Sequence, residues 1–274
     1  MTSAAQVGRQ VEAIRGRGHR PAVIVGLLSM YTAPGEAVPS RGLVRAVQAL
    51  GLSEASTRTA LSRTQADGGV VRERDGRRTS YLLAPATRAG SEAERDRMLA
   101  TAAPAEQPLS LVAFTIPEAQ RDVRHELRVE LAAAGYVSLF DGLWAATFDR
   151  AERGRAILAG LGVETGCAFR AEADAPEAAP VRIAGPELTR CRARLQEFLG
   201  LYAPLRDARL DGEQAYVVRS GLSRDWFALV DPHPALPPSL LPDWPIGEVR
   251  ETVRELWAAT AEPGRRHFGE LTAD

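Results

Sequence analysis

The chain has 274 residues, a formal net charge of −1 and an apolar content of 45%. This length allows two or three small domains, and the apolar fraction is that of an ordinary soluble protein. Residues 1–18 contain arginines but no apolar core, which excludes a secretory signal, and the aliphatic run 22–28 is too short to cross a membrane. We therefore expect a cytoplasmic protein that does not contact a membrane.

The charge is distributed unevenly along the chain. Residues 1–85 contain twelve Arg against six Asp or Glu, a balance of +6, so the remainder carries −7. A basic head on an acidic body is typical of a DNA-binding domain joined to a separate body. All 34 basic residues are arginine, which we attribute to compositional bias.

The cysteines predict neither a disulfide nor a zinc site. Cys167 and Cys191 are the only two in the chain, and they lack the spacing of metal ligands. We expect both to be buried as small apolar residues. The sequence gives no sign of a cofactor or of a bound metal.

A DNA-binding head is predicted over residues 19–86, after a flexible arm of small and polar residues at 1–18. The apolar segment 21–31 predicts a buried first helix. Ala37-Val38 can add a short strand, and residues 40–50 repeat apolar side chains at helical spacing.

Residues 53–66 predict a third helix of the head, after 21–31 and 40–50, with two different faces. Ser53 can accept an amide proton of the first turn as the N-cap. At 100° per residue, one face carries Thr57, Ala60, Leu61 and Thr64, and the other is small, hydroxylated and cationic. Such a face allows close approach to a major groove. We predict that it reads DNA through Arg58, Thr59, Ser62 and Arg63.

A basic hairpin follows this helix. Gly68-Gly69 can end the helix, and Asp75-Gly76 is a strong turn signal between strands at 70–71 and 79–83. A solvated hairpin is the simpler interpretation of the charges, but its position directly after a polar-faced helix favours the wing of a winged helix-turn-helix. We expect the wing to contact phosphates through Arg72, Arg74, Arg77 and Arg78.

The centre of the chain alternates strands and helices. A charged linker helix and a proline-containing segment are predicted over 87–108. Residues 109–175 then predict a ferredoxin-like β-α-β-β-α-β domain. Its elements are expected at 109–116, 117–134, 136–148 (a strand pair), 150–161 and 167–171.

The last third, residues 182–271, predicts a mostly α-helical domain. Helices are expected at 187–205, within 215–229 and, as the final one, at 247–260. The proline-rich stretch 231–245 cannot be a regular helix or a central strand, so it predicts an ordered loop.

A small-molecule pocket is plausible between the central and C-terminal parts. Trp144, Trp226 and Trp244 offer aromatic walls, and Arg219 and Arg224 can meet an anion. The alternative is that the tryptophans are core residues and the arginines are solvated. His233 can contact the same ligand, or it can hydrogen-bond to carbonyls of its own loop.

Three segments together resemble the PaaX-like family, named for the repressor of phenylacetate degradation. The first comprises 58–63, 76–78 and Tyr81; the second comprises 112–118, 124–128, 135–136 and 142–144; the third comprises 231–232, 236–237, 240–245 and Gly247. The resemblance implies an α+β chain with a winged helix-turn-helix, a Cas2-like central domain and an α-helical C-terminal domain. It also implies a homodimer that binds palindromic operators in double-stranded DNA. An effector, an aryl-acyl-CoA thioester in the phenylacetate case, releases the DNA.

We expect no catalysis. The four histidines form no close-spaced metal pair, and neither a Gly-rich phosphate loop nor a GxSxG motif is present. One alternative is an enzyme on the same scaffold that acts on an acyl-type metabolite, suggested by Asp231 with His233. A metal-dependent nuclease is a weaker one, because Glu118 is the only acid near the end of the first central strand.

Overall fold

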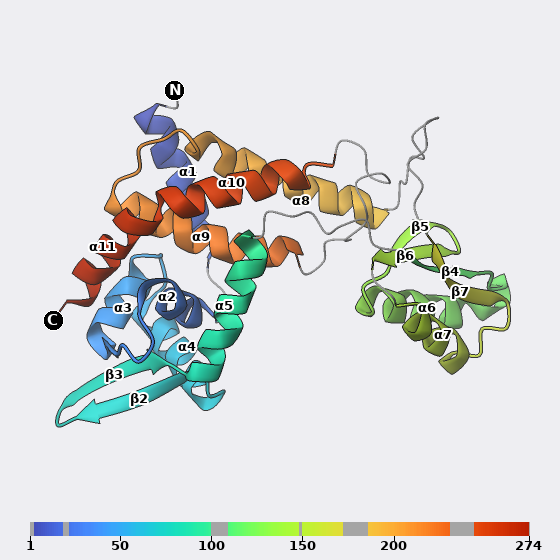
Figure 1. Cartoon of the computed structure of the whole chain (residues 1–274), viewed down its shortest axis with the longest axis horizontal. Helices are drawn as coiled ribbons and strands as arrows, with labels where there is room; N and C mark the ends of the chain where they lie inside the picture. The colour runs from blue at the N-terminus through green and yellow to red at the C-terminus, as the bar shows by residue number, and fades with distance from the viewer. Residues whose placement is uncertain are drawn as a thin grey trace. The chain divides into compact units, whose positions relative to one another are not determined.

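The computed structural model of the chain describes residues 3–18, 22–99, 109–147, 150–171, 186–230 and 244–273 (Figure 1). The chain is α+β, as predicted. Contacts divide it into two compact units. Unit 1 comprises Met1–Thr101, Glu197–Ala228 and Glu248–Asp274, and unit 2 comprises Ala102–Gln196 and Leu229–Gly247.

The head of unit 1 has the element order predicted from the sequence. Its elements are α2 (Val23–Tyr31), β1 (Val38–Pro39), α3 (Ser40–Gln48), α4 (Glu54–Ala66), β2 (Val70–Asp75) and β3 (Arg78–Leu83). The strands form an antiparallel sheet in the order β1-β3-β2. The β2–β3 hairpin extends away from helices α2, α3 and α4 (Figure 1).

Apolar side chains at helical spacing hold the head together. Ile24, Leu27 and Leu28 of α2 are fully buried, as are Leu43 and Val47 of α3. Each such side chain contributes roughly 1.5–3 kcal/mol through its removal from water. This burial explains why α2 forms although its sequence is apolar on nearly every side.

Helix α5 (Pro85–Leu99) caps the end of α2 with a buried arginine. Arg88 donates to the Thr32 carbonyl at 3.0 Å, to Thr32 Oγ1 at 2.9 Å and to the Ala33 carbonyl at 3.2 Å. A cation at a helix C-terminus is favourable because the last carbonyls lack intrahelical partners. The bonds therefore fix the chain where it leaves α2.

The predicted flexible arm differs from the structure, which forms helix α1 (Ala4–Gly16) in its place. Ser3 caps the helix, and Val7, Val11 and Ile14 are buried. Arg15 also pairs with Glu213 at 2.6 Å, a hydrogen bond that lowers the pKa of this carboxyl. The prediction relied on the small and polar composition of this segment. It overlooked three apolar residues that have the i, i+4, i+7 spacing of a helix.

Among residues 186–230 and 244–273 the structure forms the helices α8 (Pro186–Tyr202), α9 (Gly212–Val230), α10 (Ile246–Ala259) and α11 (Ala261–Thr272). The expectation that α10 is the final helix was wrong. The helix α11 that follows contains Pro263 in its first turn. A proline is tolerated there because the first amides of a helix have no carbonyl partner within it.

Helix α11 packs against α3 through backbone-to-side-chain contacts. Arg45 of α3 donates to the Leu271 carbonyl at 2.8 Å and also to the Ala273 carbonyl. A Cβ at Gly42 would lie 2.7 Å from Thr272 Cα, so the two backbones meet directly. The end of α11 is thus tied to a helix of the head.

The packing of α1 on α9 predicts opposite effects for two glycine-to-alanine substitutions. A Cβ at Gly221 would lie 2.2 Å from Ile14 Cγ2, whereas one at Gly200 meets nothing within 4 Å. Overpacking costs about 1–3 kcal/mol, and the gain in helix propensity is about 1 kcal/mol. Denaturant unfolding should therefore show Gly221→Ala less stable than wild type and Gly200→Ala equally or more stable. A stabilised Gly221→Ala would contradict the close packing of α1.

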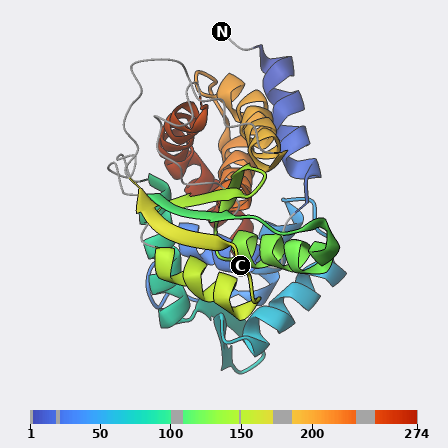
Figure 2. The same cartoon turned by 90° about the vertical axis from the view of Figure 1, so that its right-hand side faces the viewer.

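Unit 2 contains the predicted ferredoxin-like arrangement. Its elements are β4 (Leu109–Phe114), the short 3-10 helix η1 (Glu118–Gln120), α6 (Arg121–Ala133), β5 (Val137–Phe140), β6 (Leu143–Thr147), α7 (Ala151–Gly160) and β7 (Gly166–Ala171). The antiparallel sheet has the order β5-β6-β4-β7, and both helices cover one of its faces (Figure 2).

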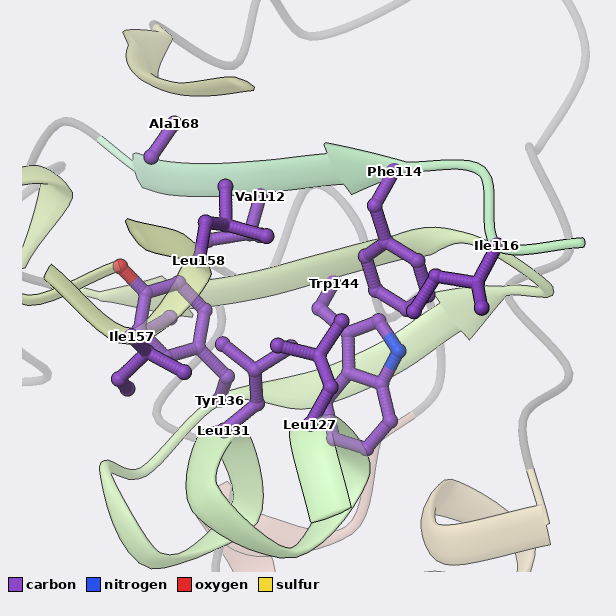
Figure 3. Close-up of a cluster of buried hydrophobic side chains, with 11 residues drawn as sticks. Val112, Phe114, Ile116, Leu127, Leu131, Tyr136, Trp144, Ile157, Leu158 and Ala168 are labelled. Atoms are coloured by element: carbon purple, nitrogen blue, oxygen red, sulfur yellow. The ribbon is translucent and has the colours of Figure 1, made fainter. Parts of the chain in front are cut away.

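The core of unit 2 lies between this sheet and its two helices. Side chains from β4, β6, α6 and α7 converge there, including Val112, Trp144, Leu127 and Ile157 (Figure 3). The buried Tyr136 hydroxyl lies 2.6 Å from Ser110 Oγ and donates to the Arg150 carbonyl at 2.7 Å. Its polar atom is therefore satisfied within an otherwise apolar cluster.

Candidate nucleic-acid interface

The ends of α4 are fixed by local signals in the sequence. Ser53 Oγ accepts the amide proton of Ser56 at 3.1 Å, which confirms the predicted N-cap. Asp67 is the C-cap, and Gly68 follows with a φ of 73°, the left-handed conformation that glycine adopts readily. The helix thus begins and ends where the sequence predicted.

The two faces of α4 are also those predicted. Thr57, Ala60, Leu61 and Thr64 are buried. The buried threonine hydroxyls donate to carbonyls one turn earlier, Ser53 for Thr57 and Ala60 for Thr64. The opposite face is exposed throughout and presents Arg58, Thr59, Ser62 and Arg63.

One arginine on the exposed face is paired with an acidic residue, which the sequence prediction did not include. Arg58 binds Glu54 at 2.6 Å through Nη2 and at 2.9 Å through Nε. The i, i+4 spacing of these residues was the available signal for this ion pair, and it was missed. Thr59 donates to the Ala55 carbonyl at 3.0 Å, so its oxygen can still accept a hydrogen bond.

The wing carries its arginines into solvent. Arg72, Arg74, Arg77 and Arg78 are all exposed. Gly76 has a φ of 57° in the two-residue loop between β2 and β3, and Arg78 lies opposite Asp75 in the ladder. Both strands are longer than the sequence suggested, since β2 reaches Asp75. The four arginines are therefore spread along an exposed two-stranded ribbon.

The base of the wing is attached to the end of α4. Gly69 donates its amide proton to the Thr64 carbonyl at 2.8 Å, and its own carbonyl accepts from Ala84 at 3.1 Å. Val70 and Leu83 are buried beside this junction. The exposed face of α4 and the arginine-bearing hairpin therefore belong to one body.

The tryptophans proposed for an effector site in unit 2 make structural contacts. Trp144 is 4% exposed and packs within the core of Figure 3. Trp244 is half-buried against a second cluster that contains Leu188, and Arg192 lies 5.3 Å from its ring centre. These contacts favour the core alternative for Trp144. A role in effector binding stays a prediction for both residues.

The proposed effector residues of unit 1 are also engaged. Arg219 donates to the Trp257 carbonyl and lies 3.7 Å from the centre of that ring. Arg224 contacts both oxygens of Asp225, at 2.7 and 2.9 Å, and donates to the carbonyls of α1 and the segment after it. Trp226 is buried. Arg224 is thus not solvated, and its ligand role stays a prediction, as does that of Arg219 and Trp226.

The residues that suggested an enzyme, Asp231 and His233, lie outside the described ranges. His233 and Asp231 belong to the segment 231–243, which the structure does not describe. No group of His, Cys, Asp and Glu within the described ranges could hold a metal ion. Cys191 is buried, which raises the pKa of its thiol to about 11, but Cys167 is exposed, so its predicted burial was wrong.

The part of the chain that the structure describes contains no helix with both the length and the apolar content that a bilayer crossing requires.

Known proteins similar to this chain point to one family. Residues 20–87 match the model described as PaaX-like protein, and residues 106–182 match the PaaX protein central Cas2-like domain. No curated protein matches the chain. A solved structure, the uncharacterised protein Rv0674 from Mycobacterium tuberculosis, is 21% identical with a TM-score of 0.53, covering 89% of this chain and 97% of that one. At that identity it supports the fold alone. The chain therefore belongs to the PaaX-like family, whose members are in general transcriptional regulators.

Proposed function

We propose that the chain is a DNA-binding transcriptional repressor that an acyl-type effector, such as an aryl- or acyl-CoA, releases from its operator. It acts by binding and not by catalysis. The observation that carries this proposal is the exposed face of α4, which backbone hydrogen bonds join to an arginine-bearing wing.

The chemistry of the two surfaces supports a division of roles. Ser62, Thr59 and Arg63 are exposed on α4, and hydroxyls and guanidinium groups are donors suited to base edges and phosphates. Arg58 must give up part of its pairing with Glu54 to join them. The wing arginines contact the phosphate backbone, where charge matters more than sequence.

Family resemblance supports a homodimer on a palindromic operator. Two copies would place two α4 faces in successive major grooves, about 34–36 Å apart along the duplex. Each α4 then reads one half-site, and each wing contacts the flanking backbone. A small head can therefore serve specific recognition, because each head of the dimer needs to read only one half-site.

The proposal predicts a specific complex with the DNA that flanks the gene. Fluorescence anisotropy with labelled duplexes from that region should give a dissociation constant of about 10⁻⁸ M or lower at physiological salt, at least about 10³-fold tighter than for scrambled duplexes. Equal, weak affinity for all duplexes would contradict specific regulation. Absence of binding at low salt together with turnover of an acyl metabolite would favour the enzyme alternative.

A further inference from the structure

Unit 1 contains a half-open cavity of about 600 Å³ between the DNA-binding head and the last helix. One wall is the end of α2, the loop that follows it and β1, residues 30–39. The other wall is a stripe along α11, formed by Arg265, Phe268, Gly269 and Thr272. A cavity of this size holds a small organic molecule.

The floor of the cavity is aromatic. Tyr31 and Phe268 stack with ring centres 4.9 Å apart and an angle of 17° between their planes. Met30, Ala37 and Val38 add apolar surface. Glu36, an acid in the lining, accepts the amide proton of Ala33 at 2.7 Å and is thus already engaged. The walls favour a ligand with an apolar, ring-sized body.

Positive charge gathers on the α11 side of the cavity. Arg265 lines it, is exposed and makes no ion pair with any residue that the structure describes. Arg219 lies near Tyr31 and is buried without a carboxylate partner among those same residues. The pKa of Arg219 is lowered to about 10, chiefly by burial and to a smaller extent by the charges of Arg265 and Arg95. An anion at this place would offset the repulsion among these arginines.

Buried polar groups beside this cluster lack partners. The Tyr31 hydroxyl, Ser220 Oγ and Arg219 Nε are buried and make no hydrogen bond. Unsatisfied buried groups are uncommon, and one of these three, the Tyr31 hydroxyl, belongs to a residue that lines the cavity.

The same stripe of α11 contacts the DNA-binding head. Thr272 lines the cavity and meets the backbone at Gly42, and Arg45 of α3 donates to the carbonyls that follow. A molecule in the cavity would therefore press on a helix that is bonded to α3, which packs against α4.

We infer that this cavity binds an organic anion with an apolar aromatic body, its charge toward Arg265, and that occupancy acts on α3 through α11. The binding site stands independently of the proposed function. The effect of occupancy on operator binding, in contrast, rests on the proposed function.

The binding site is tested with two probes that differ in one charged group. 8-Anilinonaphthalene-1-sulfonate is an aromatic anion, and N-phenyl-1-naphthylamine is the same molecule without the sulfonate. Fluorescence titration of the full chain should show the sulfonate binding at least threefold more tightly than the neutral compound. Equal affinity for both, or binding of neither, would overturn the anion site.

Two pairs of variants locate the probe. A Cβ at Gly269 meets nothing within 4 Å, so Gly269→Leu can fill the cavity without a clash, and Gly269→Ala is its small control. Gly269→Leu should weaken sulfonate binding at least tenfold, and Gly269→Ala should leave it near wild type. Arg265→Gln should weaken it three- to tenfold, whereas Arg266→Gln, on a residue outside this cavity, should not. Unchanged binding in Gly269→Leu would place the probe elsewhere.

The regulatory step has its own readout. Saturating sulfonate should lower operator affinity at least threefold in wild type and leave it unchanged in Gly269→Leu. If the probe binds but operator affinity does not change, transmission through α11 is overturned. If the chain binds no DNA at all, the proposed function fails while the titration result stands.

Discussion

Replacing Ser62 by glutamate should reduce specific operator affinity at least about 100-fold. Ser62 is exposed near the middle of the α4 face that we propose to contact DNA, between Thr59 and Arg63. A carboxylate there would oppose the phosphates and acceptor-rich base edges of a major groove, and like-charge contacts of this kind cost several kcal/mol. Glutamate is a good helix former, so α4 itself should remain folded.

The measurement is anisotropy with the specific duplex, beside circular dichroism of each variant. Ala132→Glu is the matched control, because it adds the same charge at an exposed position of α6 in unit 2. It should bind as wild type does. Wild-type affinity in Ser62→Glu would show that this face does not meet the groove.

Removing both arginines at the tip of the wing should weaken binding to every duplex and flatten its dependence on salt. Arg77 and Arg78 are exposed at the turn of the hairpin. Each phosphate contact contributes about 0.9 to the slope of log affinity against log salt, so the double alanine variant should lose about 1.8. The specific and the scrambled duplex should lose similar factors, because phosphates carry no direct sequence information.

The slope is measured over several salt concentrations with both duplexes. A variant with Arg121→Ala and Arg153→Ala controls for lost charge, since both residues are exposed in helices of unit 2. Its slope should equal that of wild type. A wing variant whose slope stays unchanged, or that loses affinity for the specific duplex alone, would refute backbone contact by the wing.

Local signals in the sequence were enough to predict the exposed face of α4 and the hairpin that follows it. Faces of α4 follow from its helical period, and its ends follow from Ser53 and Gly68, which act within a few residues. The Asp75-Gly76 turn likewise determines where the chain reverses. The same period and turn logic predicted the ferredoxin-like order of unit 2.

Features that depend on distant packing could not be predicted in this way. Helix α1 is stabilised by contacts with residues about two hundred positions away, such as Arg15 with Glu213. Helix α11 was not predicted, and its packing against α3, far away in the sequence, is a contact that local signals do not reveal. For Trp144 and Arg219 the sequence left open a ligand-binding role and a structural one. Residue type alone does not reveal whether an aromatic or cationic side chain packs in a core.

The most direct test of the DNA interface is photo-cross-linking from α4 itself. Thr59, exposed on this face, is replaced by the photoreactive residue p-benzoylphenylalanine, and Ala132 is replaced in a control. On irradiation with labelled operator, position 59 should cross-link to the duplex, with competition by unlabelled operator, and position 132 should not. A chain that binds the duplex but cross-links no better from position 59 than from position 132 would contradict the account.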